Sequence, residues 1–340
     1  MAKVSGCGNG SGADAWPPWL QGSRRHLDGL LERGHLPQAL LIHGVPGTGR
    51  RRLALWLAAR LLRLPEEALV RFASDAGSDD ESGEHGLGHP DLMQVRPPPD
   101  KAAIHVESVR ELIAFLQLTS HQGGRRVALL WPAEAMTPAA ANALLKTLEE
   151  PPAAGMIVLV TALPARLPPT VLSRCQRLRV PVPERAQALA WLAASGGTGD
   201  WDALLDFAGG APLAALGWSR AGLERQLADY ATDLEQLRRR RTTPVAVARR
   251  WIAGEASLAL RWLYLHAAAG LTAALADDGR GGTAGRRLQN PVKPTNMPLQ
   301  RLRDAEELHR HEVRGLATEV QLAAVLQRWY GDSPTGDGKH

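Results

Sequence analysis

The chain has 340 residues, 44% of them hydrophobic and 22% charged, and its formal net charge is +5. This length and composition predict a soluble globular protein with two or three domains, each with its own core. Two cysteines are too few for a disulfide framework or a four-cysteine zinc site. No apolar run has the length of a membrane span, and residues 1–15 lack the apolar centre of a signal peptide. We therefore expect a disordered leader and a cytoplasmic protein without membrane contact.

The first predicted elements are a short helix and a buried strand. Residues 16–38 are expected to form a turn and a helix with leucines along one side. The run ALLIH, residues 39–43, is short and apolar and is followed by Gly44, which is typical of a buried parallel strand. A strand, a glycine-rich turn and a helix to about Leu62 follow in the order that a P-loop requires.

The glycine-rich turn has the spacing of a P-loop but lacks two of its chemical groups. Gly44, Gly47 and Gly49 lie in the turn, and the first and last of them fit the pattern G-x-x-x-x-G-K-[ST]. Arg50 stands where a lysine would reach the phosphates, and Arg51 where a hydroxyl would bind Mg²⁺. Two interpretations stay open: a tight turn that binds nothing, or a weak anion or nucleotide site without turnover.

An acidic stretch at about residues 72–90 follows. It holds Asp and Glu among Gly and Ser, with no Lys or Arg, and is expected to be a mobile surface loop. His85 and His89 lie near these acids, but a solvated loop explains them better than a metal site. The stretch contains no cysteine, which argues against a zinc module there.

Alternating strands and helices continue to about residue 161. Strands are predicted over residues 91–95, 127–131 and 156–161, and an amphipathic helix over residues 106–118. This alternation is typical of a parallel sheet covered by helices.

The best-signalled helix lies in the stretch TPAAANALLKTLEEPP, residues 137–152. Thr137 can cap it, Pro138 suits its first position, and the two prolines at its end stop it. Its apolar side is formed by Ala141, Leu144, Leu145 and Leu148. Residues 170–180, which contain Ser-Arg-Cys, lead into a last strand.

The rest of the chain is predicted to be helical. Helices are expected over residues 184–194 and 201–208, after Pro212, and over 223–237, 245–253, 257–275, 299–311 and 319–330. Residues 277–296, rich in Gly and Arg, are expected to form an exposed loop. The run from Arg238 to Arg241 is interpreted as a solvated helix end, with phosphate contact as the alternative.

These motifs, in this order, resemble the AAA+ clamp-loader subunits, and most closely the delta-prime family of bacterial DNA polymerase III. The resemblance rests on the glycine-rich turn, on NALLKTLEEPP and on Ser-Arg-Cys. It implies an α/β fold with an AAA+ P-loop NTPase-like parallel sheet, a small helical lid and a C-terminal all-α collar that serves oligomerisation. The expected bounds are 1–15 for the leader, 16–181 for the α/β domain, 182–219 for the lid, 220–331 for the collar and 332–340 for a tail.

The resemblance also implies that the ATP site is degenerate. Pro132 stands where the family has the aspartate that holds magnesium, and Glu134 stands near the second acidic position. Thr161 matches a polar sensor residue, whereas Pro212-Leu213 stands where family ATPases carry a sensing arginine. We therefore expect no cofactor, no metal and no ATP hydrolysis by this chain alone.

Arg174, within the motif Ser173-Arg174-Cys175, is the residue that the resemblance makes functional. In the family this arginine reaches the ATP site of the neighbouring subunit, as an arginine finger does. The alternative is that Arg174 pairs with an acid of its own domain. Polar residues of the motif helix are expected to face a neighbouring subunit: Asn142, Lys146, Glu149 and Glu150.

The expected function is that of a non-hydrolysing clamp-loader subunit, which acts while neighbouring subunits bind the ATP. The implied partners are the gamma/tau and delta subunits and, through the complex, the sliding clamp and primer–template DNA. Two alternatives remain: an active gamma-like ATPase with a variant P-loop, and a nucleic-acid-binding module suggested by the positive charge.

Overall fold

The computed structural model describes residues 16–64, 89–98, 101–121, 123–195, 199–254, 256–280, 297–310 and 316–330. The predicted leader and tail, and nearly all of the predicted acidic loop at 72–90, lie outside these residues. The chain divides into two compact units, the first ending at Ala221 and the second beginning at Gly222. The two units have separate hydrophobic cores.

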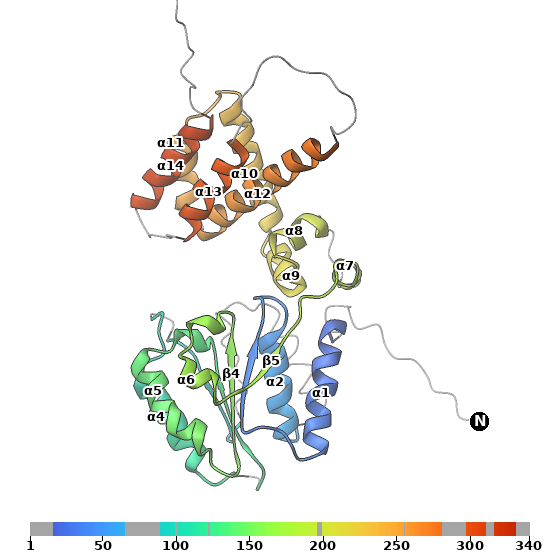
Figure 1. Ribbon diagram of the computed structural model, residues 1–340, viewed down its shortest axis with the longest axis vertical. Coiled ribbons are helices and arrows are strands. Elements are labelled where there is room, and N and C mark those ends of the chain that lie inside the picture. The colour runs from blue at the N-terminus through green and yellow to red at the C-terminus, as the bar shows by residue number, and fades with distance from the viewer. Residues whose placement is uncertain are drawn as a thin grey trace, which may run out of the picture. The chain divides into compact units, whose positions relative to one another are not determined.

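A five-stranded sheet forms the centre of the first unit (Figure 1). Its strands are β1 (Ala39–His43), β2 (Leu92–Val95), β3 (Arg126–Leu130), β4 (Gly155–Thr161) and β5 (Gln176–Arg179). The order is β2-β3-β4-β1-β5, and all neighbours are parallel. The predicted parallel sheet is confirmed. Its order places His43 at the end of β1 opposite Thr161 at the end of β4, so the turn after β1 lies beside the sensor position.

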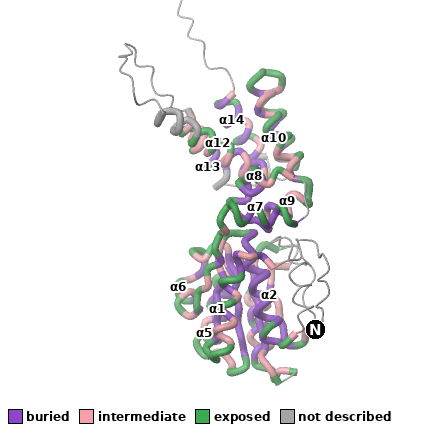
Figure 2. Tube along the Cα trace, turned by 90° about the vertical axis from the view of Figure 1, so that its right-hand side faces the viewer, coloured by how far each residue is buried: buried purple, intermediate pink, exposed green. Residues whose placement is uncertain are grey.

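Helices cover both faces of the sheet (Figure 1). On one side lie α4 (Val106–Gln117), α5 (Pro138–Glu149) and α6 (Pro169–Leu172), and on the other lie α1 (Gln21–Glu32) and α2 (Arg50–Leu61). Every residue of α2 except Arg60 is buried, and the helix is purple along its length in Figure 2. A helix that is buried on all sides belongs to the core of the unit rather than to its surface.

Helix α5 begins and ends where its sequence predicts. The Thr137 hydroxyl accepts a hydrogen bond from the Ala140 amide at 3.2 Å, and Pro138 occupies the first helical turn. Leu144 and Leu148 are buried in the core that α5 shares with α4 and the sheet. The side chains of the other face of α5 stay available for contacts outside the unit.

Three short helices complete the first unit after the sheet. They are α7 (Arg185–Ala194), α8 (Trp201–Phe207) and α9 (Pro212–Arg220). Phe207 of α8 and Trp218 of α9 meet edge to face, with ring centroids 4.8 Å apart. The lid that the resemblance implies was expected over residues 182–219, and these three helices lie in that part of the chain.

Helices are the only regular secondary structure in the described residues of the second unit. It contains α10 (Leu223–Arg238), α11 (Pro244–Ala253), α12 (Ala256–Arg280), α13 (Met297–Arg310) and α14 (Leu316–Tyr330). Tyr230, Trp251 and Trp262 pack together in its core, with ring centroids 4.8 to 5.8 Å apart. Trp251 and Trp262 therefore serve packing in this unit.

One predicted boundary in the second unit is wrong. The expected loop was to begin at Asp277, but α12 continues to Arg280, and residues 281–296 lie outside the described residues. Once a helix is formed, each further residue adds a hydrogen bond at little cost, and no proline interrupts the chain near residue 277.

The arginine run at the end of α10 is solvated, as the preferred interpretation has it. Arg238 and Arg239 are exposed and donate from Nε to Glu235 at 2.7 and 2.5 Å. These hydrogen bonds lower the pKa of the Glu235 carboxyl to about 2. The positive charges at this helix end are thus partly neutralised by a neighbour on the same helix.

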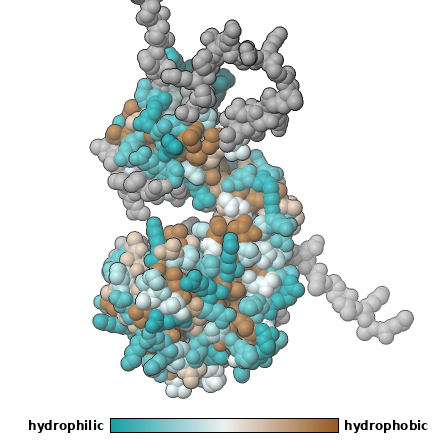
Figure 3. Space-filling model, in the orientation of Figure 1, coloured by the Kyte–Doolittle hydropathy of each residue, from teal (hydrophilic) through white to brown (hydrophobic). Residues whose placement is uncertain are grey.

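None of the helices in the described part of the chain combines the length and the apolar character that a membrane crossing requires. On the face shown in Figure 3, hydrophobic side chains are scattered among hydrophilic ones.

Candidate functional site

The glycine-rich turn after β1 has the backbone of a tight loop that leads into a helix. Gly47 and Gly49 have φ angles of 78° and 95°, in the left-handed region that favours glycine, and Gly49 caps α2. Thr48 between them is fully buried. The strand, turn and helix of a P-loop are thus all formed.

Helix α9 packs directly on this turn. A Cβ atom on Gly47 would lie 2.4 Å from the Cβ of Ala214 and 2.8 Å from its backbone nitrogen. The Leu213 amide donates a hydrogen bond to the Gly47 carbonyl at 3.0 Å. Only glycine fits at residue 47 because the lid helix touches the backbone there.

The segment before α1 covers the same turn from another direction. A Cβ atom on Gly49 would lie 2.8 Å from Cδ1 of Leu20 and 3.2 Å from Cδ1 of Leu213. The Trp19 indole donates to the Thr48 carbonyl at 2.8 Å. We call Trp19, Leu20, Leu213 and Ala214 the turn cover.

Most of the turn cover escapes prediction from the sequence. The apolar pair Pro212-Leu213 at the place of a sensing arginine is the one signal that the sequence offers. Trp19 and Leu20 look like ordinary core residues of a first helix, and Ala214 is inconspicuous. Their contact with the turn is a tertiary feature.

The three arginines at the start of α2 are buried. Arg50, Arg51 and Arg52 are 8%, 8% and 3% exposed. The Arg51 guanidinium lies over the Trp131 ring, 4.9 Å from its centroid, which stabilises a buried cation through the ring's negative face. The residue at the place of the magnesium-binding hydroxyl is therefore packed against an aromatic ring.

The end of β1 is electropositive. The pKa of His43 is lowered from 6.5, first by burial and then by the nearby charges of Arg179, Arg177 and Arg50. The imidazole is therefore neutral at pH 7 and does not act as a cation beside the turn.

The end of β3 holds the second group of predicted site residues. Pro132 has no side-chain oxygen for a metal. Glu134 accepts a hydrogen bond from the Ala162 amide at 3.0 Å, and the buried Thr161 hydroxyl accepts one from the Leu163 amide at 3.0 Å. Both polar side chains thus accept hydrogen bonds from backbone amides of the segment that follows β4. Within the described residues, no three His, Cys, Asp or Glu side chains gather in a way that could hold a metal ion.

Arg174 meets Glu149, another of the predicted site residues. The Arg174 Nε donates to Glu149 Oε1 at 2.7 Å, and Nη2 donates to the same oxygen. Nη1 donates to the Thr170 carbonyl at 2.9 Å and to the Ser173 hydroxyl at 3.3 Å. The Arg174 side chain is 32% exposed and that of Glu149 is 50% exposed. In the free chain Arg174 thus pairs with an acid of its own domain, at a place that solvent reaches.

The other predicted interface residues lie on the exposed side of the same helix. Asn142, Lys146 and Glu149 follow one another at helical spacing on α5, with Glu150 directly after it, and all four are exposed. The structure therefore places all four on the surface, and it brings Glu149 into contact with Arg174.

Comparison with known proteins identifies the family. The family model described as "DNA polymerase III, delta subunit" matches residues 21–184. A DNA polymerase III subunit delta' from Pseudomonas aeruginosa is 34% identical over 252 residues, which cover 72% of this chain and 74% of the relative. The chain belongs to the DNA polymerase III delta' family. The predicted resemblance is confirmed.

Other members of the delta' family match over a smaller share. The protein from Yersinia pestis is 38% identical over 52% of this chain and 51% of its own length. The protein from Escherichia coli is 35% identical over 59% of this chain and 60% of its own length. A solved structure of a gamma subunit-related protein from Thermotoga maritima is similar with a TM-score of 0.46 and 21% identity, over 89% of this chain and 98% of that chain. The family match contains the turn, α5 and Arg174.

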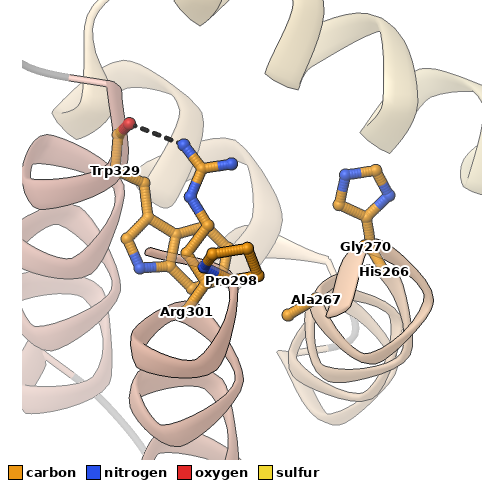
Figure 4. A pocket seen from close by; sticks show the side chains of 6 residues that line it. All are labelled: His266, Ala267, Gly270, Pro298, Arg301 and Trp329. Carbon is orange, nitrogen blue, oxygen red and sulfur yellow. Dashed lines mark hydrogen bonds between the residues drawn. The ribbon is translucent and has the colours of Figure 1, made fainter. Parts of the chain in front are cut away.

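The second unit of this delta' family member has a small cavity of about 150 Å³ (Figure 4). It is lined by His266, Ala267, Gly270, Pro298, Arg301 and Trp329. Arg301 donates to the Trp329 carbonyl at 2.9 Å, along the dashed line in the figure. These six residues include no carboxylate, hydroxyl or thiol, so the lining offers no acid–base or nucleophilic pair.

Cys175 of the Ser-Arg-Cys motif is a packing residue of the core. It is 8% exposed, and burial raises the pKa of its thiol from 9.0 to about 11, against the opposing effect of Arg177. Because the thiolate is the reactive form, alkylation of Cys175 by iodoacetamide at pH 8 is expected to be about 100-fold slower in the folded chain than in urea. Mass spectrometry of the Cys175 peptide over time measures the rate. Equal rates in the two states would contradict the burial of this thiol.

Proposed function

We propose that this chain is a non-hydrolysing subunit of the DNA polymerase III clamp loader, which helps to place the sliding clamp on primed DNA. Membership of the delta' family supports the assignment to this complex. The contact between Ala214 and Gly47 is the observation that carries the non-hydrolysing part: α9 packs on the backbone of the turn, and a lid that moves with nucleotide would have to break this contact.

The chemistry of the turn supports the same proposal. Arg50 and Arg51 replace the lysine and the hydroxyl of a P-loop, and Pro132 leaves the magnesium position without an oxygen. Glu134, which could serve as a base, instead binds the Ala162 amide. Two separate parts of an ATP site thus lack the groups that phosphoryl transfer requires.

In this proposal Arg174 acts on ATP held by an adjacent gamma or tau subunit. Its side chain is reachable by solvent, and its neighbours on α5 form an exposed polar surface. A guanidinium that enters a neighbour's site stabilises the charge that develops on the transferred phosphoryl group. The chain itself carries no cofactor.

The partners are the gamma/tau and delta subunits and, through the complex, the sliding clamp and primer–template DNA, in the cytoplasm. The helical second unit would hold the subunits together as a collar. Its own hydrophobic core, which includes Tyr230 and Trp251, would let it fold as a separate unit for this role.

The test is to mix the purified full-length chain with Mg-ATP, with a gamma or tau subunit as the positive control. We expect no turnover above the buffer background and no stoichiometric binding of nucleotide by equilibrium dialysis. Multiple turnovers by the isolated chain would support an active gamma-like ATPase instead. Tight DNA binding by the chain alone, with a steep dependence on salt, would support a nucleic-acid-binding module.

A further inference from the structure

The hydrogen bonds of Arg174 leave little of its guanidinium unused. A guanidinium has five N–H groups. Nε uses one of them on Glu149, Nη2 uses one on the same carboxylate, and Nη1 uses two on Thr170 and Ser173. Within the described residues, one N–H group of Nη2 remains, on the Nη1/Nη2 edge of the guanidinium and not on the Nε/Nη2 edge that Glu149 holds.

The backbone of Glu149 is held by its helix, whereas the exposed side chain of Arg174 needs a contact to select one rotamer. Glu149 is the last residue of α5, directly after Thr147 and Leu148, which are both buried in the first unit. Arginine has many rotamers, and an exposed one visits several of them unless a contact selects one. The carboxylate at the end of α5 provides that contact.

We propose that Glu149 is the positioning residue of Arg174. It keeps hold of the Nε edge and turns the remaining N–H of Nη2 toward the phosphate of ATP in the adjacent subunit. This inference rests on the proposed function, since it presumes that Arg174 acts in trans. The carboxylate also neutralises the guanidinium in the free subunit, so an exposed cation is not left to pair with other anions.

The pair contributes little to the stability of the fold. Both side chains are partly exposed, and ion pairs of this kind are weak because water and salt screen them. A variant without the carboxylate should therefore fold and assemble normally. Its effect should appear in the rate of ATP hydrolysis, which depends on the orientation of the finger.

The experiment uses the complex reconstituted from the full chain, gamma or tau, delta, the clamp and primed DNA. Single-turnover hydrolysis is followed in the wild type and in the variants Glu149→Gln, Arg174→Ala and the double variant. We expect Glu149→Gln to lower the maximal rate of the phase that depends on Arg174 about fivefold. A change of this size corresponds to the free energy that one exposed ion pair contributes. The ATP concentration for half-maximal rate should stay unchanged. The double variant should be no slower than Arg174→Ala.

Asp28→Asn is the matched control. Arg60 donates from Nε and Nη2 to one oxygen of Asp28, both at 3.3 Å, which repeats the arrangement of the Arg174 pair elsewhere in the first unit. This variant should hydrolyse ATP at the wild-type rate. A decrease equal to that of Glu149→Gln would mean that loss of any such pair slows the complex, and would overturn the proposal.

A second readout does not depend on activity. Phenylglyoxal modifies accessible guanidinium groups, and peptide mass spectrometry follows Arg174 in the isolated chain. Glu149→Gln should make its modification about fivefold faster, since the group is then released from its ion pair. Asp28→Asn should accelerate modification of Arg60 and leave that of Arg174 unchanged.

The outcomes separate the two proposals. If Arg174→Ala slows hydrolysis but Glu149→Gln changes neither hydrolysis nor modification, the positioning role is wrong and the finger stands. The double variant could instead be slower than Arg174→Ala by the same factor by which Glu149→Gln is slower than the wild type. Glu149 would then act independently of Arg174, and the proposal would be overturned. If Arg174→Ala leaves hydrolysis unchanged, the finger itself is wrong, and the positioning role with it.

Discussion

Replacing Arg174 by alanine is expected to slow hydrolysis at the ATP site that it serves about 1000-fold, the lower end of what arginine fingers contribute. The reason is that positive charge is removed where negative charge develops on the phosphoryl oxygens. In single-turnover experiments on the reconstituted complex, a fraction of the bound ATP should then react in a separate slow phase.

The Arg174→Ala variant should fold and assemble like the wild type, because its side chain is partly exposed and its pair with Glu149 is weak. Circular dichroism and gel filtration of the complex check this. Arg174→Lys is an informative comparison, since it keeps the charge but loses the planar fork. Arg60→Ala removes an exposed arginine of the same unit from a similar ion pair and serves as the control. Wild-type kinetics in Arg174→Ala would refute the finger.

Replacing Gly47 by alanine is expected to lower the free energy of unfolding by about 2 to 5 kcal/mol, from left-handed backbone strain and overpacking together. The new Cβ would lie 2.4 Å from the Cβ of Ala214, and the backbone atoms of α9 cannot yield without moving the lid helix. Urea unfolding followed by tryptophan fluorescence is a suitable measurement, because Trp19 and Trp191 pack near the turn with ring centroids 5.2 Å apart.

Gly34→Ala separates the two causes. Gly34 has a similar φ of 68°, but a Cβ atom there would meet nothing within 4 Å. This variant should lose only the strain of the backbone, about 1 to 2 kcal/mol. If Gly47→Ala is no less stable than Gly34→Ala, then α9 does not press on the turn, and the main support for a lid that cannot move is lost.

The elements of the fold could be predicted because their signals are local. Thr137 and Pro138 start α5 by their own chemistry, and short apolar runs such as residues 39–43 suit a buried parallel strand. The motifs then indicated the family, and the resemblance implied the order of the expected domains. The end of α12 was missed because nothing near Asp277 strongly favours or stops a helix.

The contacts of the candidate site could not be predicted in the same way. Nothing near Gly47 in the sequence indicates that Ala214 touches it, since the contact depends on how the lid packs. Consecutive arginines usually indicate a surface, yet Arg50 to Arg52 are buried with α2. The sequence leaves open whether Arg174 has an acid partner in its own domain, and which of several acids it would be, because that choice is made by the turn between α6 and β5.

Strand β5 lies at the edge of the sheet, and its pairing has a consequence for solubility. It pairs with β1, and Arg177 and Arg179 are exposed on a strand of only four residues. A long, flat, apolar edge would invite the edge of another copy and start aggregation, whereas a short edge with repelling charges discourages it. The same four residues that finish the sheet thus disfavour edge-to-edge pairing between copies of the chain.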